Sequence, residues 1–244
     1  MEYSRVRVGI GRVPAAGAVM SRPAIIGLTV RAKRREAESA KITVSGRPRM
    51  KFPTCECRNA RGRKAITVVA VELTMTIPNA IEVIRDVTGR LGERGLVGAG
   101  TVLHADACRA VIAAGAQYVV SPITRLELVA AAHAADKPVM LGAYTPTEAQ
   151  LAHEAGADFI KIFPADKLGP GYIKALRAPL PHLRIVPTGG VDLATAADFL
   201  KAGCVALGVG SSLVSAEILR TSNWPELTRL AKAFVEVVSA ARRK

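Results

Sequence analysis

The sequence predicts an α/β protein, a (β/α)8 TIM barrel preceded by an atypical basic segment. From residue 65 onward, short apolar runs alternate regularly with helical stretches. Three of the expected helices end in an Ala-Gly pair just before the next strand, at Gly115, Gly156 and Gly203. Glycine suits the left-handed turn that ends a helix. With 244 residues, 50% of them hydrophobic, the chain is long enough for one barrel of this kind.

Seven strand–helix pairs can be followed from residue 65 to the last helix. Strands are expected where apolar residues cluster in short runs, and helices where they recur every three or four positions. In the last helix, Leu227, Leu230, Phe234 and Val238 form one such stripe. The expected strands are 65–75, 96–99, 118–120, 138–142, 159–163, 184–187 and 205–208, and the expected helices are one from 78 onward, then 104–114, 125–135, 145–155, 170–177, 193–202 and 223–240.

Residues 1–64 are expected to form an atypical basic head, and residues 65–244 the barrel. Seven pairs are one short of eight, so the first strand has to come from the head, where 24–30 (AIIGLTV) is the candidate. A short charged helix is expected at 32–40. Residues 45–64 mix glycine, proline, cysteine and basic residues without a period, which is typical of a loop or a partly disordered segment. The first strand–helix unit is therefore expected to be distorted.

The formal net charge of +14 is concentrated in the head. Residues 1–64 contain 16 Lys and Arg against 4 Asp and Glu, whereas residues 65–244 contain 18 against 16. A basic arm for nucleic acid is one interpretation. The head has few aromatic residues among its basic ones and no known nucleic-acid-binding motif, which favours a solvated tail.

No apolar run approaches the ~20 residues of a membrane span, so no membrane partner is expected. Cys55 and Cys57 form a bare C-x-C, without the second pair or histidine cluster that a zinc site requires. Cys108 and Cys204 lie in apolar surroundings. Free thiols favour a reducing cytoplasm, and an arginine-rich organelle leader is the alternative to a cytoplasmic location.

The run 159–165 (FIKIFPA) places one lysine among apolar and aromatic residues. In a strand, Lys161 shares a face with Phe159 and Phe163. Burial disfavours the ammonium form, so the pKa of Lys161 should fall from ~10.4 toward ~7 to 8, which leaves a neutral amine that can attack a carbonyl carbon. The alternative is an edge-strand lysine whose head reaches water.

A second charged residue in an apolar strand is Glu72, which shares its expected inward face with Ala70 and Thr74. A carboxylate inside a barrel and near a lysine can act as general acid and base. A structural ion pair is the alternative role.

Glycine-rich turns follow three of the expected strands. They are Gly98-Ala-Gly-Thr101, Pro187-Thr-Gly-Gly190 and Gly208-Val-Gly-Ser-Ser212. Small residues at these positions let a ligand approach backbone N–H groups closely. In barrels, the turns after strands seven and eight commonly bind phosphate, so the last two turns predict a phosphorylated ligand.

In this order, VELTMT, GAGTV, FIKIFPA, PTGGV and GVGSSLV resemble the motifs of the 2-keto-3-deoxy-6-phosphogluconate and 4-hydroxy-2-oxoglutarate (KDPG/KHG) aldolase family. The resemblance extends over residues 66–240. It implies a homotrimeric class I aldolase that reversibly cleaves a 2-keto-3-deoxy-6-phospho sugar acid to pyruvate and glyceraldehyde 3-phosphate. It also implies that neither a metal nor another cofactor is needed.

The resemblance further implies roles for individual residues. Lys161 would form an imine with the C2 carbonyl of the substrate, and Glu72 would move protons through a water molecule. The implied substrate-binding residues are Thr101 and Pro122 at the pyruvate, Thr188, Gly189, Gly190, Gly210 and Ser211 at the phosphate, and Thr76 and Phe163 elsewhere in the site.

Three features depart from the family pattern. Thr76 stands where many members have an arginine that is thought to meet the substrate carboxylate, which leaves the identity of the sugar acid open. Ser121-Pro122-Ile123 replaces the usual S-P-G turn. The family's opening strand and helix are echoed only by Val30-Arg31-Ala32, and we hypothesise that residues 33–64 are an insertion or a misread reading frame. Peptides covering 35–63, found by mass spectrometry of the native protein, would contradict a misreading.

Other functions stay open beside the aldolase. A phosphate-binding barrel isomerase or synthase would share the glycine turns but needs no buried lysine, and a non-catalytic paralogue could use the basic arm for nucleic acid. A metal-dependent aldolase is disfavoured, because all four histidines fall in or beside expected helices and loops, away from the strand ends. These histidines are His104, His133, His153 and His182.

Overall fold

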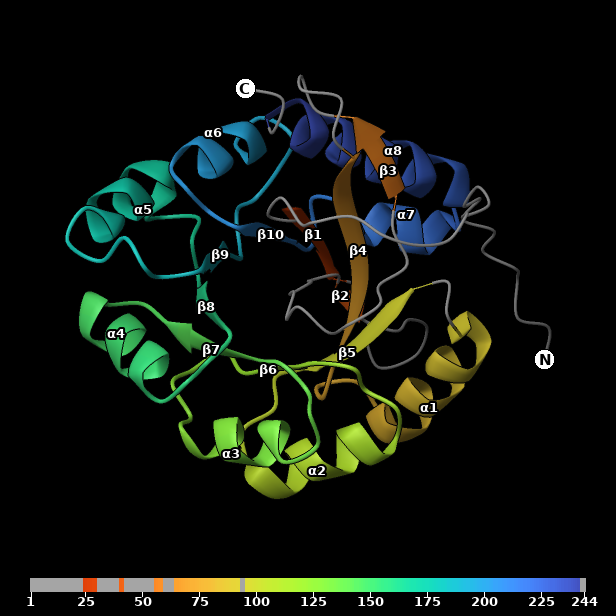
Figure 1. The fold of residues 1–244 in the computed structure, drawn as a ribbon. Coiled ribbons are helices and arrows are strands. Elements are labelled where there is room, and N and C mark those ends of the chain that lie inside the picture. Colours follow the sequence, from red (N-terminus) through yellow and green to blue (C-terminus); the bar gives the residue numbers. More distant parts are fainter. Residues whose placement is uncertain (1–23, 30–39, 42–54, 59–63, 93–94, 242–244) are drawn as a thin grey trace.

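The computed structural model describes residues 24–29, 40–41, 55–58, 64–92 and 95–241. Within these residues, strands alternate with helices along the chain, and the helices lie outside a curled sheet (Figure 1). The predicted α/β class, with a curled parallel sheet of the TIM-like kind, is thereby confirmed.

Six parallel strands form the continuous part of the sheet, in the order β4-β5-β6-β7-β8-β9. They are β4 (Lys64–Thr74), β5 (Leu96–Gly100), β6 (Val119–Val120), β7 (Val139–Ala143), β8 (Phe159–Ile162) and β9 (Ile185–Pro187). β10 (Ala206–Val209) lies beside β9, where Thr188 and Gly208 make one parallel bridge. β1 (Ala24–Thr29) pairs in parallel with both β10 and β4.

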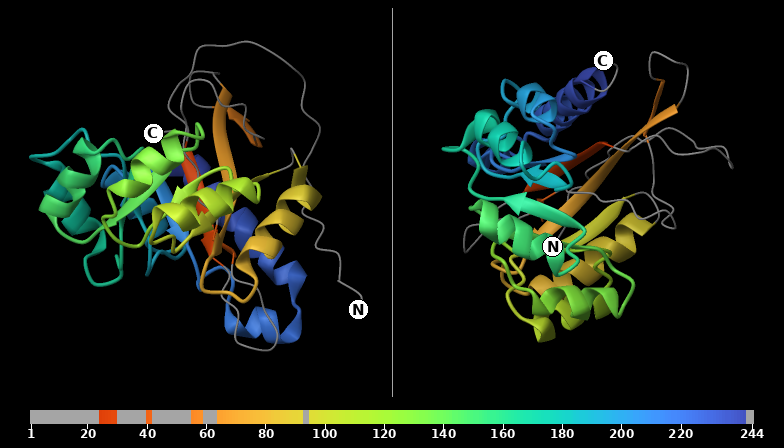
Figure 2. Two further views of the ribbon diagram at one scale, coloured as in Figure 1. Left: turned by 90° about the horizontal axis from the view of Figure 1, so that it is seen from below. Right: turned by 60° about the vertical axis from the view of Figure 1, so that its left-hand side comes forward.

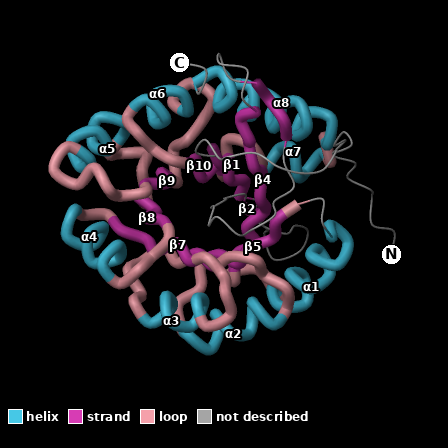
Figure 3. The backbone as a smooth tube through the Cα atoms, viewed as in Figure 1, coloured by secondary structure: helices cyan, strands magenta, loops and turns pink. Residues whose placement is uncertain are grey.

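The helices form the outer layer, which Figure 3 separates from the strands by colour. They are α1 (Ala80–Leu91), α2 (Ala105–Ala113), α3 (Glu127–His133), α4 (Pro146–Glu154), α5 (Gly169–Arg177), α6 (Ala196–Lys201), α7 (Ala216–Thr221) and α8 (Trp224–Ala241). In α8, Phe234 and Val238 of the predicted stripe are buried, and Leu227 and Leu230 pack against the core. The helix therefore stays on the sheet because its apolar face is removed from water.

Local chemistry explains where the helices start and stop. Gly115, Gly156 and Gly203 have φ angles of 106°, 94° and 97°, so the predicted turns with positive φ are confirmed. At the start of α4, the backbone N–H of Glu148 donates to the Thr145 hydroxyl at 3.3 Å, and the backbone N–H of Thr145 donates to the Glu148 carboxylate at 2.7 Å. This reciprocal cap fixes the turn that joins β7 to α4.

Part of the head differs from the prediction. The sequence indicates a loop or disorder for 45–64, yet β3 (Cys55–Arg58) forms an antiparallel pair with the start of β4. β4 extends well past β5 (Figure 2), and its first backbone groups find hydrogen-bond partners in β3. This pairing through space has no signature in the local sequence.

Two further elements complete the comparison. β2 (Ala40–Lys41) is antiparallel to the carboxyl ends of β1 and β4. The charged helix predicted at 32–40 lies outside the described residues except for Ala40, which is in β2. The sequence reading also missed α7, although the serine before its first residue accepts a hydrogen bond from the Ile218 N–H at 3.2 Å, which is a recognisable N-cap signal.

Candidate active site

Glu72 lies within β4 and is only 1% exposed. Its backbone is in register with Gly98 on β5. The carboxylate leans toward the carboxyl end of β5, where it fills the space that a side chain would occupy at Gly100. An ideal Cβ at Gly100 would lie 1.8 Å from Glu72 Oε1 and 2.6 Å from Cδ. The glycine at position 100 is therefore what allows the carboxylate to lie against β5.

Lys161 on β8 is 2% exposed and ranks among the largest fully buried side chains of the described residues. Its register partners are Gly142 on β7 and Val186 on β9. The Nζ atom lies 5.0 Å from the centroid of the Phe163 ring, which is a cation–π distance. The alternative of an edge-strand lysine with its head in water is wrong. The amine is thus held inside the sheet, beside an aromatic ring.

The turn after β6 packs onto the strand beside the lysine. An ideal Cβ at Gly142 would lie 2.1 Å from both the carbonyl carbon and the carbonyl oxygen of Pro122. Since in-register residues of parallel strands point to the same side, the Pro122 backbone lies on the side of the sheet toward which Lys161 points. The Thr124 hydroxyl donates to the Gly142 carbonyl at 2.8 Å and ties the turn to β7. Sequence reasoning missed Gly142, whose signal is a glycine inside an apolar strand.

The segment Gly98-Ala-Gly-Thr101 differs from the prediction of a turn with room for a ligand, because Gly98, Ala99 and Gly100 belong to β5. Gly100 accommodates Glu72, and Gly98 accommodates the ring of Tyr118, whose Cζ would lie 2.2 Å from an ideal Cβ. Both glycines thus make room for side chains of the protein itself. Thr101 follows with φ 58°, a left-handed conformation that costs a non-glycine residue about 1 kcal/mol or more and is typical of functional sites.

Thr76 lies just past the end of β4 and is exposed. Its hydroxyl is 2.8 Å from the hydroxyl of the buried Thr74, so the two threonines form a neutral hydrogen-bonding pair where an arginine would place a charge. Two hydroxyls bind a hydroxyl or a carboxylate more weakly than a guanidinium binds a carboxylate.

The turn after β9 combines a buried hydroxyl with two glycines in left-handed conformations. Thr188 is buried, and its Oγ1 would lie 2.2 Å from an ideal Cβ at Gly208. Gly189 and Gly190 have φ angles of 88° and 70°, which side chains rarely adopt. The Ala165 N–H donates to the Thr188 carbonyl at 2.9 Å, which joins this turn to the segment after the lysine strand.

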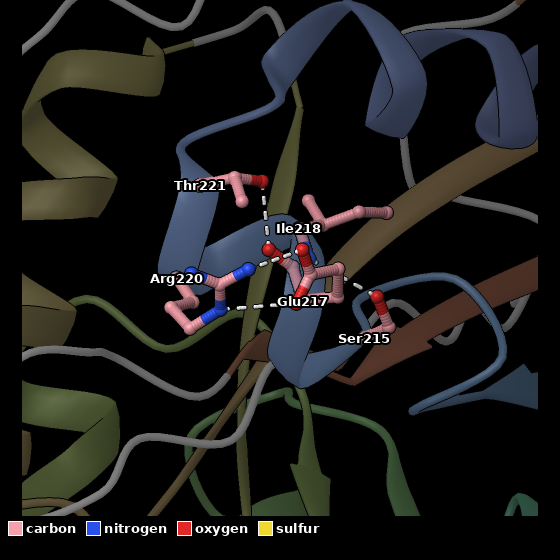
Figure 4. Close-up of polar contacts among 5 residues, drawn as sticks. All are labelled: Ser215, Glu217, Ile218, Arg220 and Thr221. Atoms are coloured by element: carbon pink, nitrogen blue, oxygen red, sulfur yellow. Dashed lines mark hydrogen bonds and ion pairs between the residues drawn. The ribbon is translucent and has the colours of Figure 1, made fainter.

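The turn after β10 leads into α7. The Gly210 carbonyl accepts hydrogen bonds from the N–H groups of Leu213 at 2.9 Å and Val214 at 3.0 Å. Ser211, the residue after Gly210, is exposed. Figure 4 shows how α7 is held together. The Arg220 Nε donates to the Glu217 carboxylate at 3.0 Å, and the Thr221 hydroxyl donates to the Glu217 carbonyl at 2.8 Å. The Gly210 carbonyl thus ties the turn after β10 to the segment that leads into α7.

The predicted site residues gather at one edge of the sheet. Because β4 to β10 are parallel, their carboxyl ends meet at the same edge. Residues on or directly after these ends are Thr76, Thr101, Pro122, Phe163, Thr188, Gly189, Gly190, Gly210 and Ser211. Glu72 and Lys161 lie within their strands, below this rim. The strand order thus brings an amine, a carboxylate and several hydroxyl and backbone groups to the same end of the sheet.

No group of three or more metal-ligating side chains occurs among the described residues. His133 lies instead at the end of α3, where its Nε2 is 2.8 Å from the Asp158 carboxylate. Asp158 also accepts the Val139 N–H at 2.9 Å, so the pair connects a helix end to the start of β7. In the part of the chain that the structure covers, none of the helices has the length and apolar character for crossing a membrane.

The described residues thus form an α/β fold whose curled parallel sheet carries a buried lysine on β8 and a buried glutamate on β4, two groups that carbonyl chemistry can use. The model of the family described as KDPG and KHG aldolase matches residues 55–230. The chain belongs to this family, whose named members among its relatives are aldolases, carbon–carbon lyases of the class I, Schiff-base type.

Several relatives support the assignment. The 2-dehydro-3-deoxy-6-phosphogalactonate aldolase of Escherichia coli (strain K12) is 37% identical over 172 residues, which cover 69% of this chain and 83% of that one. The 2-dehydro-3-deoxy-phosphogluconate aldolase of Pseudomonas aeruginosa is 32% identical over 180 residues, 72% of this chain and 80% of that one.

Solved structures agree. A native KDPGal structure superposes with a TM-score of 0.65 at 35% identity and covers 70% of this chain and 81% of that one. The KDPG aldolase of Legionella pneumophila, with pyruvate captured as a covalent carbinolamine, gives a TM-score of 0.62 at 28% identity and covers 67% of this chain and 79% of that one.

Proposed function

We propose that this protein is an aldolase that cleaves a 2-keto-3-deoxy-6-phospho sugar acid reversibly to pyruvate and glyceraldehyde 3-phosphate. The observation that carries the proposal is Lys161, an amine that is 2% exposed on the strand beside the Pro122 turn. Relatives named for such substrates, and a related structure that holds pyruvate as a carbinolamine, support this substrate class.

The reaction begins at the amine. Lys161 Nζ attacks the C2 carbonyl, and loss of water leaves a protonated imine. A base then takes the proton of the C4 hydroxyl, the C3–C4 bond breaks, and its electron pair moves through C3 to the imine nitrogen, which gives an enamine and releases the aldehyde. Glu72, acting through a water molecule, supplies the proton that C3 takes up, and hydrolysis of the imine releases pyruvate.

The rim residues position the substrate in this proposal. Thr101 and Pro122 border the pyruvate part, and the buried Thr188 with Gly189, Gly190, Gly210 and Ser211 binds the phosphate through hydroxyl and backbone N–H groups. Thr76 and Phe163 complete the site, with Thr76 near the carboxylate end of the sugar acid. The reaction needs no metal or cofactor as electron acceptor, because the imine nitrogen itself accepts the electron pair.

The test is chemical trapping. Incubation with pyruvate and borohydride should add the mass of a reduced pyruvate imine at Lys161, and Lys161→Met should abolish both the adduct and pyruvate release. A panel of phosphorylated and unphosphorylated 2-keto-3-deoxy acids of both C4 configurations then identifies the substrate. An intact protein without any adduct would favour the isomerase or synthase alternative, which needs no imine.

Two structural proposals accompany the activity. The first is a complete eight-stranded barrel with residues 24–29 as its first strand, which the parallel pairing of β1 with both β10 and β4 supports. Deletion of residues 1–23 should then leave a folded enzyme, whereas deletion of 1–30 should not, as judged by circular dichroism and thermal melting. Equal stability of the two truncated proteins would contradict a role for the strand.

The second is a homotrimer. Large apolar side chains are exposed on three successive loops, after β6, β7 and β8, and a second copy of the chain is the proposed occupant of this patch. Its members are Ile123 at 45%, Leu126 at 45%, Tyr144 at 43% and Phe163 at 38% exposure. Leu126→Lys should lower the mass measured by light scattering from trimer to monomer, with Leu151→Lys, an exposed leucine on α4, as the matched control. A monomeric parent protein would refute the assembly.

A further inference from the structure

Tyr118 lies directly before β6 and is buried on the same face of the sheet as the candidate site. None of the motifs found in the sequence includes it. It is 5% exposed. Its ring lies over Gly98, where Cζ, Cε2 and Cε1 would be 2.2, 2.3 and 2.4 Å from an ideal Cβ. The three nearly equal distances mean that the outer half of the ring lies face-on over the glycine. Any larger residue at position 98 would displace the phenol.

The direction of the ring follows from the strand order. Tyr118 is in line with Gly98, because Val119 on β6 is in register with Ala99 on β5. The ring therefore reaches sideways from β6 across β5, and its hydroxyl, which extends beyond Cζ, points toward β4. The β4 residue in register with Gly98 is Glu72. The Tyr118 ring and the Glu72 carboxylate thus lie over the same glycine-rich strand.

The two side chains occupy successive places on one face of β5. Positions 98 and 100 point to the same side and are about 6.6 Å apart along the strand. The Tyr118 ring fills the first, and the Glu72 carboxylate fills the second, with Oε1 1.8 Å from an ideal Cβ at Gly100. The ring tip and the carboxylate therefore occupy neighbouring places on one face of β5.

We propose that Tyr118 is a positioning residue for Glu72, and that its hydroxyl holds the carboxylate in the orientation needed for proton transfer at C3. The proposal rests on the proposed aldolase function. A buried tyrosine hydroxyl donates to a nearby acceptor, and a hydrogen bond to a charged group is stronger than one between neutral groups. Phenylalanine would fill the space over Gly98 equally well, so packing alone does not explain the hydroxyl.

Pyruvate alone separates the two half-reactions. The enzyme forms the imine through Lys161, and Glu72 then exchanges the methyl hydrogens of bound pyruvate with solvent. Borohydride trapping reports the first step, and loss of the methyl proton signal of pyruvate in deuterated water reports the second. A residue that acts through Glu72 changes only the second.

Tyr118→Phe should reduce the exchange rate by about 10-fold to 100-fold, the range that one hydrogen bond to a charged group supplies, with borohydride trapping within about twofold of the parent. In a Glu72→Gln background, Tyr118→Phe should have no further effect. Tyr172→Phe is the matched control, because it deletes a hydroxyl that donates to the Tyr144 carbonyl outside the sheet at 2.7 Å. Exchange in this control should equal that of the parent.

Gly98→Ala gives a second perturbation of the same contact, because the added methyl group displaces the phenol while the hydroxyl is retained. It should slow exchange like Tyr118→Phe. Parental exchange in a folded Tyr118→Phe protein would overturn the inference, as would a parallel loss of trapping and exchange, which would assign Tyr118 to the imine step. A parent protein that forms no adduct would overturn the aldolase function itself, and this result is distinguishable because it is seen before any tyrosine is changed.

Discussion

The contact between Gly100 and Glu72 gives the sharpest test of the proposed acid–base group. In Gly100→Ala, the new methyl carbon would lie 1.8 Å from Glu72 Oε1, and an ordinary contact begins at 3.4 Å, so the carboxylate must move by more than an ångström. Misplacement of a catalytic group by about 1 Å can reduce a rate about 100-fold. We therefore expect turnover and pyruvate methyl exchange to fall by about that factor.

Trapping of pyruvate at Lys161 should stay within about twofold, because Lys161 lies on β8, three strands away from Gly100 on β5. The free energy of unfolding should fall by no more than about 1–3 kcal/mol, since the group that has to yield is the end of a side chain and not backbone. Gly89→Ala in α1 is the control, because an added Cβ there meets nothing within 4 Å. Its activity should equal that of the parent.

The assay combines steady-state pyruvate release, methyl exchange in deuterated water and borohydride trapping, each on protein whose melting curve shows that it is folded. If Gly100→Ala turned over at the parental rate, the position of Glu72 against β5 would be irrelevant to catalysis. If trapping fell together with exchange, the substitution would act on the amine, and the assignment of separate roles to Lys161 and Glu72 would be refuted.

Three other predictions follow from contacts elsewhere in the structure. Gly142→Ala should destabilise the protein by about 3 kcal/mol or more in urea unfolding, because the added methyl meets the Pro122 backbone at 2.1 Å, and an unchanged midpoint would contradict this packing. Backbone N–H groups before α4, and then the Thr145 hydroxyl, hold the pKa of the Glu148 carboxyl below its usual range. The contribution of Glu148 to stability is therefore complete above the unfolded-state pKa of about 4.3, and it is lost as the pH falls through the lower folded-state pKa. Glu148→Gln should flatten this part of the acid unfolding curve, and coincident curves would refute the cap. Burial raises the pKa of the Cys204 thiol well above its usual range, so thiol reagents at pH 8 should modify Cys204 only after denaturant is added. Labelling of the native protein would show that the surroundings of Cys204 open to solvent.

Local patterns were sufficient to predict most of the regular elements from residue 65 onward. The period of two in 159–163 predicted that Lys161 and Phe159 share a face and are buried, and both are. The Ala-Gly helix ends predicted turns whose glycines have positive φ angles. These signals are carried by residues a few positions apart, so one sequence contains them. β3 was not predicted because its stability comes from pairing with β4, and a short C-x-C segment carries no mark of that partner.

The candidate site was predicted less completely, because its glycines have two different causes. A glycine in the sequence shows only that a side chain is missing at that position. Which neighbouring side chain fills the space is decided by the register of the adjacent strands. At Gly98 and Gly100 the space is filled by Tyr118 and Glu72. At Gly189 the nearest atoms to an ideal Cβ are 3.5 Å away, an ordinary contact, so glycine is favoured there by its φ of 88° and not by lack of room. The prediction that glycines admit a ligand therefore holds as a hypothesis for Gly189, whereas Gly190 makes room for Asp166 and the glycines of β5 admit side chains of the protein itself.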